Sequence, residues 1–469
     1  MSISALVRTG QYSLAVQECD KALQSTPGDP RLFTLKAIAL SKLGQSSEAL
    51  AEFQSALNIN SNYLPALAGA AELKYQLGSS DAIVYLDRLL KIKPEDQVAH
   101  AMRAAVAWKA GDCPVAVEHF AKAYEQIASQ AAALHEYGVC LIRLKRLDAA
   151  SDTFKRWRQL EPGNRQAAYA LALVQVLNKE YKDAIGALEP WLSDTNGESK
   201  AWELASTAYE ALGDTPNAVK SLRRAILLNP DRAELYVEFS SISFEHKSYQ
   251  VGVDIINAGL SRLPRSAKLY VARGVLYAQM GQYERADQDF SDAALLDPNE
   301  ETSSNAQALA EIQANRLGDA LNTVEKRLQQ HPADPFLHYL LSEILVKDGA
   351  QPQSPEFSRA IAAAERAVQL KPDFVLARDV LSRLYLESGQ TVKAITQCRL
   401  TLKDDPDDQV ALYRLIRALR TENATRYDAE ISQLLHRLAQ VREQAKQREV
   451  QTSQYKLVEA SVDTLSNKP

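Results

Sequence analysis

The 469-residue sequence lacks most features of catalytic and membrane proteins. Its four cysteines form no CxxC pair, so neither a disulfide framework nor a zinc ribbon is indicated. No stretch approaches the run of about 18 apolar residues that a membrane-spanning helix needs. The N-terminal segment has no basic region followed by an apolar core, so it is not typical of a secretory signal. The phosphate-binding loop GxxxxGK[ST], the GxGxxG turn and the GxSxG elbow are also missing.

The charge balance argues against a further class of protein. With 54 basic and 59 acidic residues the net charge is −5, whereas dedicated nucleic-acid binders are usually basic. We therefore expect no nucleic-acid partner. Apolar residues make up 46% of the chain and charged residues 24%, which is typical of a folded protein rather than a disordered one.

Small residues recur at an interval of 34 along almost the whole chain, with one step of 33 and one of 40. The members of this series are Ala15, Ala49, Ala82, Ala116, Ala150, Ala184, Ala218, Gly252, Ala286, Ala320, Ala360 and Ala394. Prolines follow the same interval, as from Pro230 to Pro264 and on to Pro298. A fixed period of this length indicates tandem repeats, each of which is one supersecondary unit.

The stretch from Ala267 to Glu300 shows what one unit contains. Leu269, Gly274 and Tyr277 are spaced as one side of a helix, which ends before Gly281. A second helix follows, with Ala286 and Phe290 on one stripe, and it ends before Pro298 because proline cannot continue a helix. Each unit is therefore predicted to be a helical hairpin in which small residues allow close approach.

This unit resembles the tetratricopeptide repeat. The resemblance is carried by Gly274, Gly281, Tyr283, Ala286, Phe290, Ala293 and Pro298, and in a second copy by Trp202, Tyr209, Gly213, Ala218, Leu222, Ala225 and Pro230. It implies an all-α fold, a right-handed α-solenoid (superhelix) of antiparallel helical hairpins. It also implies a protein or peptide partner, no cofactor and no metal. The resemblance covers about residues 1–425.

The predicted organisation has four parts. A partial first repeat occupies residues 1–29, and eleven repeats follow over 30–408. A degenerate repeat with a long capping helix covers 409–449, and a disordered tail covers 450–469. The sequence predicts a six-residue insertion between the two helices of the repeat that begins at Pro335, and a polar, weakly packed helix at the start of the repeat over 301–334.

The candidates for chemistry favour packing over catalysis. Cys19 and Cys398 occupy a slot that holds phenylalanine in other repeats, and we interpret Cys113 and Cys140 as packing or incidental residues. The seven histidines form no i, i+4 ligand pair. We therefore expect no catalytic or metal-binding residues and no enzymatic activity.

The family resemblance implies that first helices line a concave groove. In the repeat over 165–198 the first helix is apolar on two sides, which is typical of a helix covered on both faces. Earlier repeats continue the second stripe, and Glu203, Thr207 and Glu210 replace it further along. The predicted groove residues are Tyr75, Trp108, Ile142, Tyr169, Leu173, Val176 and Leu177. Two interpretations stay open: hairpin packing, or binding of a peptide.

We expect a non-catalytic scaffold that binds a partner peptide or helix in this groove. The alternatives are a regulatory or assembly subunit of an enzyme or of an envelope or secretion complex, and a nucleic-acid-associated factor. Self-association is left open. The sequence as it stands indicates a cytoplasmic location; a native start upstream of Met1 would allow a periplasmic or membrane-anchored one.

Overall fold

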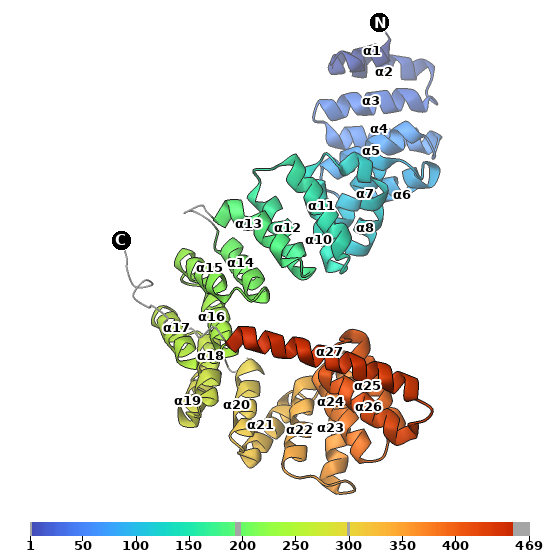
Figure 1. Cartoon of the computed structure of the whole chain (residues 1–469). Coiled ribbons are helices and arrows are strands. Elements are labelled where there is room, and N and C mark those ends of the chain that lie inside the picture. The colour runs from blue at the N-terminus through green and yellow to red at the C-terminus, as the bar shows by residue number, and fades with distance from the viewer. Residues whose placement is uncertain (1, 193–197, 298–300, 454–469) are drawn as a thin grey trace. The chain divides into compact units, whose positions relative to one another are not determined.

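The computed structural model describes residues 2–192, 198–297 and 301–453. Within these ranges the chain forms helices and no strands. The contacts divide it into two compact units, Met1–Thr195 and Asn196–Pro469. In each unit, consecutive helices pair as antiparallel hairpins and the hairpins stack on one another (Figure 1). The predicted all-α solenoid of helical hairpins is confirmed.

The helices of the first unit are α1 (Ile3–Arg8), α2 (Tyr12–Ser25), α3 (Pro30–Lys42), α4 (Ser46–Ile59), α5 (Leu64–Gln76), α6 (Ala82–Ile92), α7 (Gln97–Lys109), α8 (Cys113–Lys122), α9 (Tyr124–Ile127), α10 (Ala131–Arg143), α11 (Leu147–Leu160), α12 (Arg165–Leu177) and α13 (Tyr181–Leu192). The first helices of its hairpins are α1, α3, α5, α7, α10 and α12, and the second helices are α2, α4, α6, α8, α11 and α13.

The helices of the second unit are α14 (Ser199–Ala211), α15 (Thr215–Leu228), α16 (Ala233–Glu245), α17 (Tyr249–Arg262), α18 (Ala267–Gln279), α19 (Tyr283–Leu296), α20 (Glu301–Gln313), α21 (Leu317–Gln330), α22 (Pro335–Lys347), α23 (Pro355–Leu370), α24 (Val375–Glu387), α25 (Thr391–Asp404), α26 (Gln409–Asn423) and α27 (Asp428–Ser453). Its even-numbered members from α14 to α26 are first helices.

The small-residue series lies on the second helices, and all twelve members are buried. The hairpin of α18 and α19 shows why. Ala286 and Phe290 are both 0% exposed, and the Phe290 ring occupies the space that a side chain at Gly274 would need. A Cβ atom at Gly274 would lie 2.7 Å from Phe290 Cε1, closer than real contacts allow. The two helices therefore pack closely where the Phe290 ring lies against Gly274, and Ala286 is buried on the same helix as that ring.

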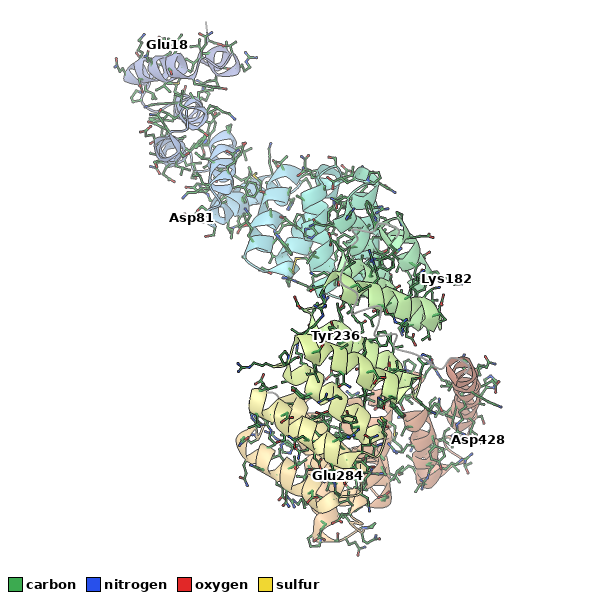
Figure 2. All side chains as sticks on the ribbon, turned by 90° about the vertical axis from the view of Figure 1, so that its left-hand side faces the viewer. Glu18, Asp81, Lys182, Tyr236, Glu284 and Asp428 are labelled. Atoms are coloured by element: carbon green, nitrogen blue, oxygen red, sulfur yellow. A yellow bond between two sulfur atoms is a disulfide. The ribbon has the colours of Figure 1, made fainter. Side chains whose placement is uncertain are left out.

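The turn inside this hairpin needs a left-handed residue. Gly281 has φ 72°, a conformation that glycine adopts without the steric penalty of a Cβ atom. The backbone N–H of Gln282 then donates to Tyr277 O at 2.9 Å, which satisfies a carbonyl at the end of α18. Charged side chains such as Lys182, Glu284 and Asp428 are exposed, whereas Tyr236 is 2% exposed inside its unit (Figure 2).

The insertion after Pro335 is shared between a loop and a helix. The segment 348–354 connects α22 to α23, and α23 has 16 residues whereas α19 has 14. Ala360 still takes the small-residue position, at 0% exposure, so the extra residues do not disturb the hairpin contact. The polar start of the repeat over 301–334 is helical in α20, and its residues Ala308 and Ala310 are buried.

Two features depart from the expected pattern. A short helix, α9, lies between α8 and α10, because the second helix of that repeat ends at Lys122 and the chain turns at Ala123. The capping helix α27 extends to Ser453, four residues into the segment predicted to be disordered. The remainder of that prediction, 454–469, lies outside the described residues.

We predict that Ala286→Leu destabilises the second unit locally. A larger side chain in a closely packed site typically costs about 1–3 kcal/mol. Because each repeat contacts only its neighbours, the melting transition should broaden rather than shift as a whole. Ala294→Leu is the control, since Ala294 is exposed on the same helix. Equal thermal unfolding and limited proteolysis of the two variants would show that the close-packing assignment is wrong.

Candidate functional site

The seven predicted groove residues lie on four first helices of the first unit. Tyr75 is on α5, Trp108 on α7 and Ile142 on α10, and α12 carries the other four. We call this set the apolar strip: Tyr75, Trp108, Ile142, Tyr169, Leu173, Val176 and Leu177. No member is buried; six are half-buried and Leu177 is 46% exposed. The strip is therefore partly accessible from outside the hairpins.

Cations from the following repeat lie over two rings of the strip. Lys109 Nζ is 5.6 Å from the centroid of the Tyr75 ring, and Arg143 Cζ is 5.4 Å from that of Trp108. Such contacts contribute about 0.5–1 kcal/mol at exposed sites. They orient the rings and join neighbouring first helices. The surface of the strip is thus apolar with basic groups along it.

A cavity of about 220 Å³ adjoins the strip at Tyr75. Its walls come from α5, α7, α8, α9 and α10. Most lining side chains are small or apolar, including Ala101, Ala105 and Met102, and Glu136 supplies a carboxylate. Sequence reasoning missed this hollow, because the apolar stripe was read from the large residues and the cavity is formed by small ones.

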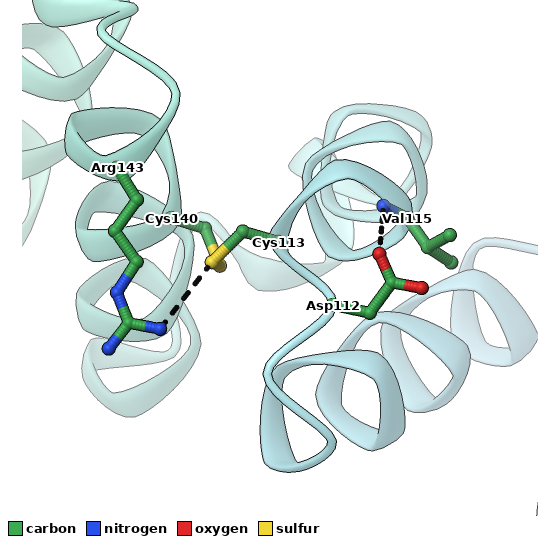
Figure 3. Close-up of a disulfide and its surroundings, with 5 residues drawn as sticks. All are labelled: Asp112, Cys113, Val115, Cys140 and Arg143. Atoms are coloured by element: carbon green, nitrogen blue, oxygen red, sulfur yellow. Dashed lines mark hydrogen bonds between the residues drawn. A yellow bond between two sulfur atoms is a disulfide. The ribbon is translucent and has the colours of Figure 1, made fainter. Parts of the chain in front are cut away.

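The structure corrects the interpretation of two cysteines. Cys113 at the start of α8 and Cys140 on α10 are joined by a disulfide across 27 residues of sequence (Figure 3). They belong to consecutive repeats, so the bond fixes one hairpin against the next. Nη1 of the Arg143 guanidinium lies 4.0 Å from Cys113 Sγ. Cys19 and Cys398 are buried and free, in keeping with a packing role.

The repeat spacing contained a signal for this pairing. Cys113 follows the turn after one first helix, and Cys140 lies near the end of the next first helix, so stacking brings the two positions together. The bond joins α8 to α10, and both helices contribute residues to the cavity wall, Phe120 from α8 and Ala133 and Glu136 among those from α10.

Glu203, Thr207 and Glu210, predicted to follow the strip, lie in the second unit, and each has a hydrogen-bond partner there. Arg232 donates two hydrogen bonds to the Glu203 carboxylate, at 2.6 and 2.8 Å. Glu210 Oε1 lies 2.8 Å from His246 Nε2. Thr207 donates to Glu238 at 3.2 Å. Burial, with a smaller repulsion from Glu203, raises the pKa of Glu238 to about 7.

The described residues contain no group of three or more histidine, cysteine or acidic side chains that could hold a metal ion. None of the described helices combines the length and the apolar character needed to cross a bilayer.

Comparisons with known proteins agree with the repeat pattern. Family models described as tetratricopeptide repeat match residues 107–174, 199–232 and 267–300. Superkiller protein 3 of Schizosaccharomyces pombe is 26% identical over 296 residues, which cover 60% of this chain and 21% of that protein. The TPR repeat-containing thioredoxin TDX of Arabidopsis thaliana is 32% identical over 131 residues, covering 27% of this chain and 30% of the relative.

A similar solved structure is that of yeast Tom70, with a TM-score of 0.44 and 15% identity over 95% of each chain. The chain spans less than a third of the length of the two curated relatives named above.

We predict that Glu238 makes the second unit less stable as pH rises from about 4.5 to 7. Its pKa in the folded state lies above the ordinary 4.5, so the folded state binds more protons in that range and loses stability as they dissociate. Glu238→Gln should raise the melting temperature at about pH 8 and change it little at about pH 4. Glu245→Gln, exposed on the same helix, is the control. An equal effect at both pH values would contradict the assignment.

We predict that Cys113→Ala destabilises the repeats around α8 and α10. For a loop of 27 residues the chain-entropy model gives about 3–4 kcal/mol. Hydrogen exchange should speed up in α8–α10 and remain unchanged in the second unit. Adding a reductant should reproduce this in the wild type and have no further effect on the variant. Unchanged exchange in the reduced wild type would show that the bond does not stabilise this region.

Proposed function

Because the chain is a tetratricopeptide repeat protein, we propose that it is a non-catalytic scaffold that holds a segment of a partner protein along the apolar strip of the first unit. The segment is an extended peptide or an amphipathic helix laid across several repeats. The tetratricopeptide fold is consistent with protein–protein interaction, and the proposal adds where the partner lies and which side chains it contacts.

One observation carries this proposal: the strip is apolar, includes three aromatic rings and lies on four first helices, yet no member is buried. Monomeric proteins rarely expose large contiguous apolar patches without a use. Aromatic side chains commonly dominate binding energy at such patches. The exposure of Leu177, 46%, supports a role for the strip outside the hairpin interior.

The burial pattern on α12 separates the two sides of this helix. Ala168 and Ala172 are both 0% exposed and face the hairpin interior. Tyr169 and Leu173 are each one residue further along the chain and are half-buried. One stripe of α12 is thus buried in the hairpin, and a second stripe beside it, with Tyr169 and Leu173, is partly exposed. A partner that covers the second side would remove its apolar surface from water, which favours binding.

The double substitution Tyr169→Glu and Leu173→Glu should weaken partner binding by about 2 kcal/mol or more, roughly thirtyfold in Kd. The cost in fold stability should be much smaller, since neither side chain is buried. The probe is a peptide selected against the wild-type chain from a random displayed library, and fluorescence anisotropy measures its Kd.

The control is Val84→Glu, because Val84 is 59% exposed on the second helix α6, away from the strip. It should bind the selected peptide as the wild type does. Unchanged binding by the double variant, or a large drop in its melting temperature, would contradict the proposal. So would a library that yields no binding peptide.

A further inference from the structure

The cavity beside Tyr75 is a hollow created by two alanines. Ala101 and Ala105 on α7 stand in the same repeat positions as Tyr169 and Leu173 on α12, 68 residues later. At these two positions α12 has a tyrosine ring and a leucine side chain, whereas the alanines of α7 leave the space unfilled. Ala133 on α10 and Met102 on α7 continue the apolar wall. At about 220 Å³ the space is far larger than the roughly 10–15 Å³ that one water molecule needs.

Glu136 is the acidic member of the cavity wall, and its carboxylate is half-buried. Among the described residues it forms no salt bridge and no hydrogen bond through its side chain. The cation that acts on the Glu136 carboxylate is Lys109, whose ammonium group lies over the Tyr75 ring. Burial raises the pKa of Glu136, and Lys109 only partly opposes this. A carboxylate in an apolar hollow thus lacks a close partner of opposite charge.

We propose that this cavity receives a lysine or arginine side chain of the partner segment, with its alkyl stem against Ala101, Ala105 and Met102 and its cationic head on the Glu136 carboxylate. The proposal rests on the proposed function, since it names the chemistry of the segment that lies on the apolar strip. Tyr75 belongs to both the strip and the cavity, so the basic residue would sit next to the segment's apolar contacts.

Charge and desolvation disfavour both an acidic and a purely apolar side chain in this cavity. An acidic side chain would bring a second negative charge beside Glu136. A purely apolar one would cover the carboxylate without a compensating hydrogen bond, which is costly. A basic side chain suits both the apolar wall and the carboxylate. Its alkyl stem is apolar, and its cationic head forms a charge-assisted hydrogen bond with a carboxylate.

The experiment uses peptides selected from a random dodecapeptide library against the full-length chain. Selected peptides should share a lysine or arginine beside apolar residues. Glu136→Gln should weaken the binding of a selected peptide by about tenfold or more. The same loss should follow when the peptide's basic residue is replaced by norleucine. Combining both changes should cost little more than either one, since each removes the same contact.

Two further variants complete the test. Ala105→Leu should fill the hollow and also weaken binding, and α12 shows that this repeat position accepts leucine. Glu72→Gln is the matched control, because Glu72 is an exposed carboxylate on α5 that accepts a hydrogen bond from Gln76. It should leave the Kd unchanged. Thermal unfolding of each variant shows whether a loss of binding comes from a loss of fold.

The outcomes distinguish a failure of this inference from a failure of the proposed function. Peptides that lack a basic residue, or that bind the Glu136→Gln and wild-type chains equally, overturn the inference. If the same peptides still lose affinity for the Tyr169→Glu and Leu173→Glu chain, the proposed function survives. A library that yields no binding peptide at all overturns both.

Discussion

The fold depends on one contact, repeated along the small-residue series: the close approach of two helices across a small side chain. The hairpin of α18 and α19 is the clearest example, because Ala286 is 0% exposed and the Phe290 ring fills the space beside Gly274. A bulkier residue at this position would separate the helices, and a smaller ring would leave a void. Because all twelve positions of the series are buried, the same kind of contact recurs in successive repeats, and similar units can stack.

Stacking of this kind leaves each first helix with a second face. The hairpin contact uses one side, as Ala168 and Ala172 show on α12, and the side that carries Tyr169 and Leu173 is left half-buried. In the first unit, cations over aromatic rings connect neighbouring repeats along that side, and the buried Cys113–Cys140 disulfide joins α8 to α10. A solenoid gains stability only from adjacent repeats, so these cross-repeat contacts also fix the spacing of the surface that a partner would meet.

The architecture could be predicted well from the sequence because the same residue pattern recurs in each repeat. Ala218 and Ala286 reveal the same contact, so a periodic pattern could be read without knowing any distance. The capping helix and the insertion after Pro335 were also predicted, although the structure gives part of that insertion to α23. The disulfide was missed, because the two cysteines were judged one at a time rather than by their positions in consecutive repeats.

The candidate site was harder to predict, since it consists of departures from the repeat rather than of the repeat itself. The large residues of the apolar strip are visible in the sequence, but their half-buried state depends on packing that only the structure shows. The hollow at Ala101 and Ala105 is less visible still, because alanine is also the most common residue at the hairpin contacts.

What distinguishes these two alanines is their position within the repeat. Alanines of the hairpin series are 0% exposed, whereas at the cavity wall Ala101 is half-buried and Ala105 is 8% exposed. In α12 the corresponding position holds Tyr169. The repeats of one chain can therefore be compared with one another, position by position. Where one repeat has a large side chain and another has a small one at the same position, the shared fold does not require that difference. Such a difference alters the surface that a partner meets, so it is where specificity for one partner can be encoded.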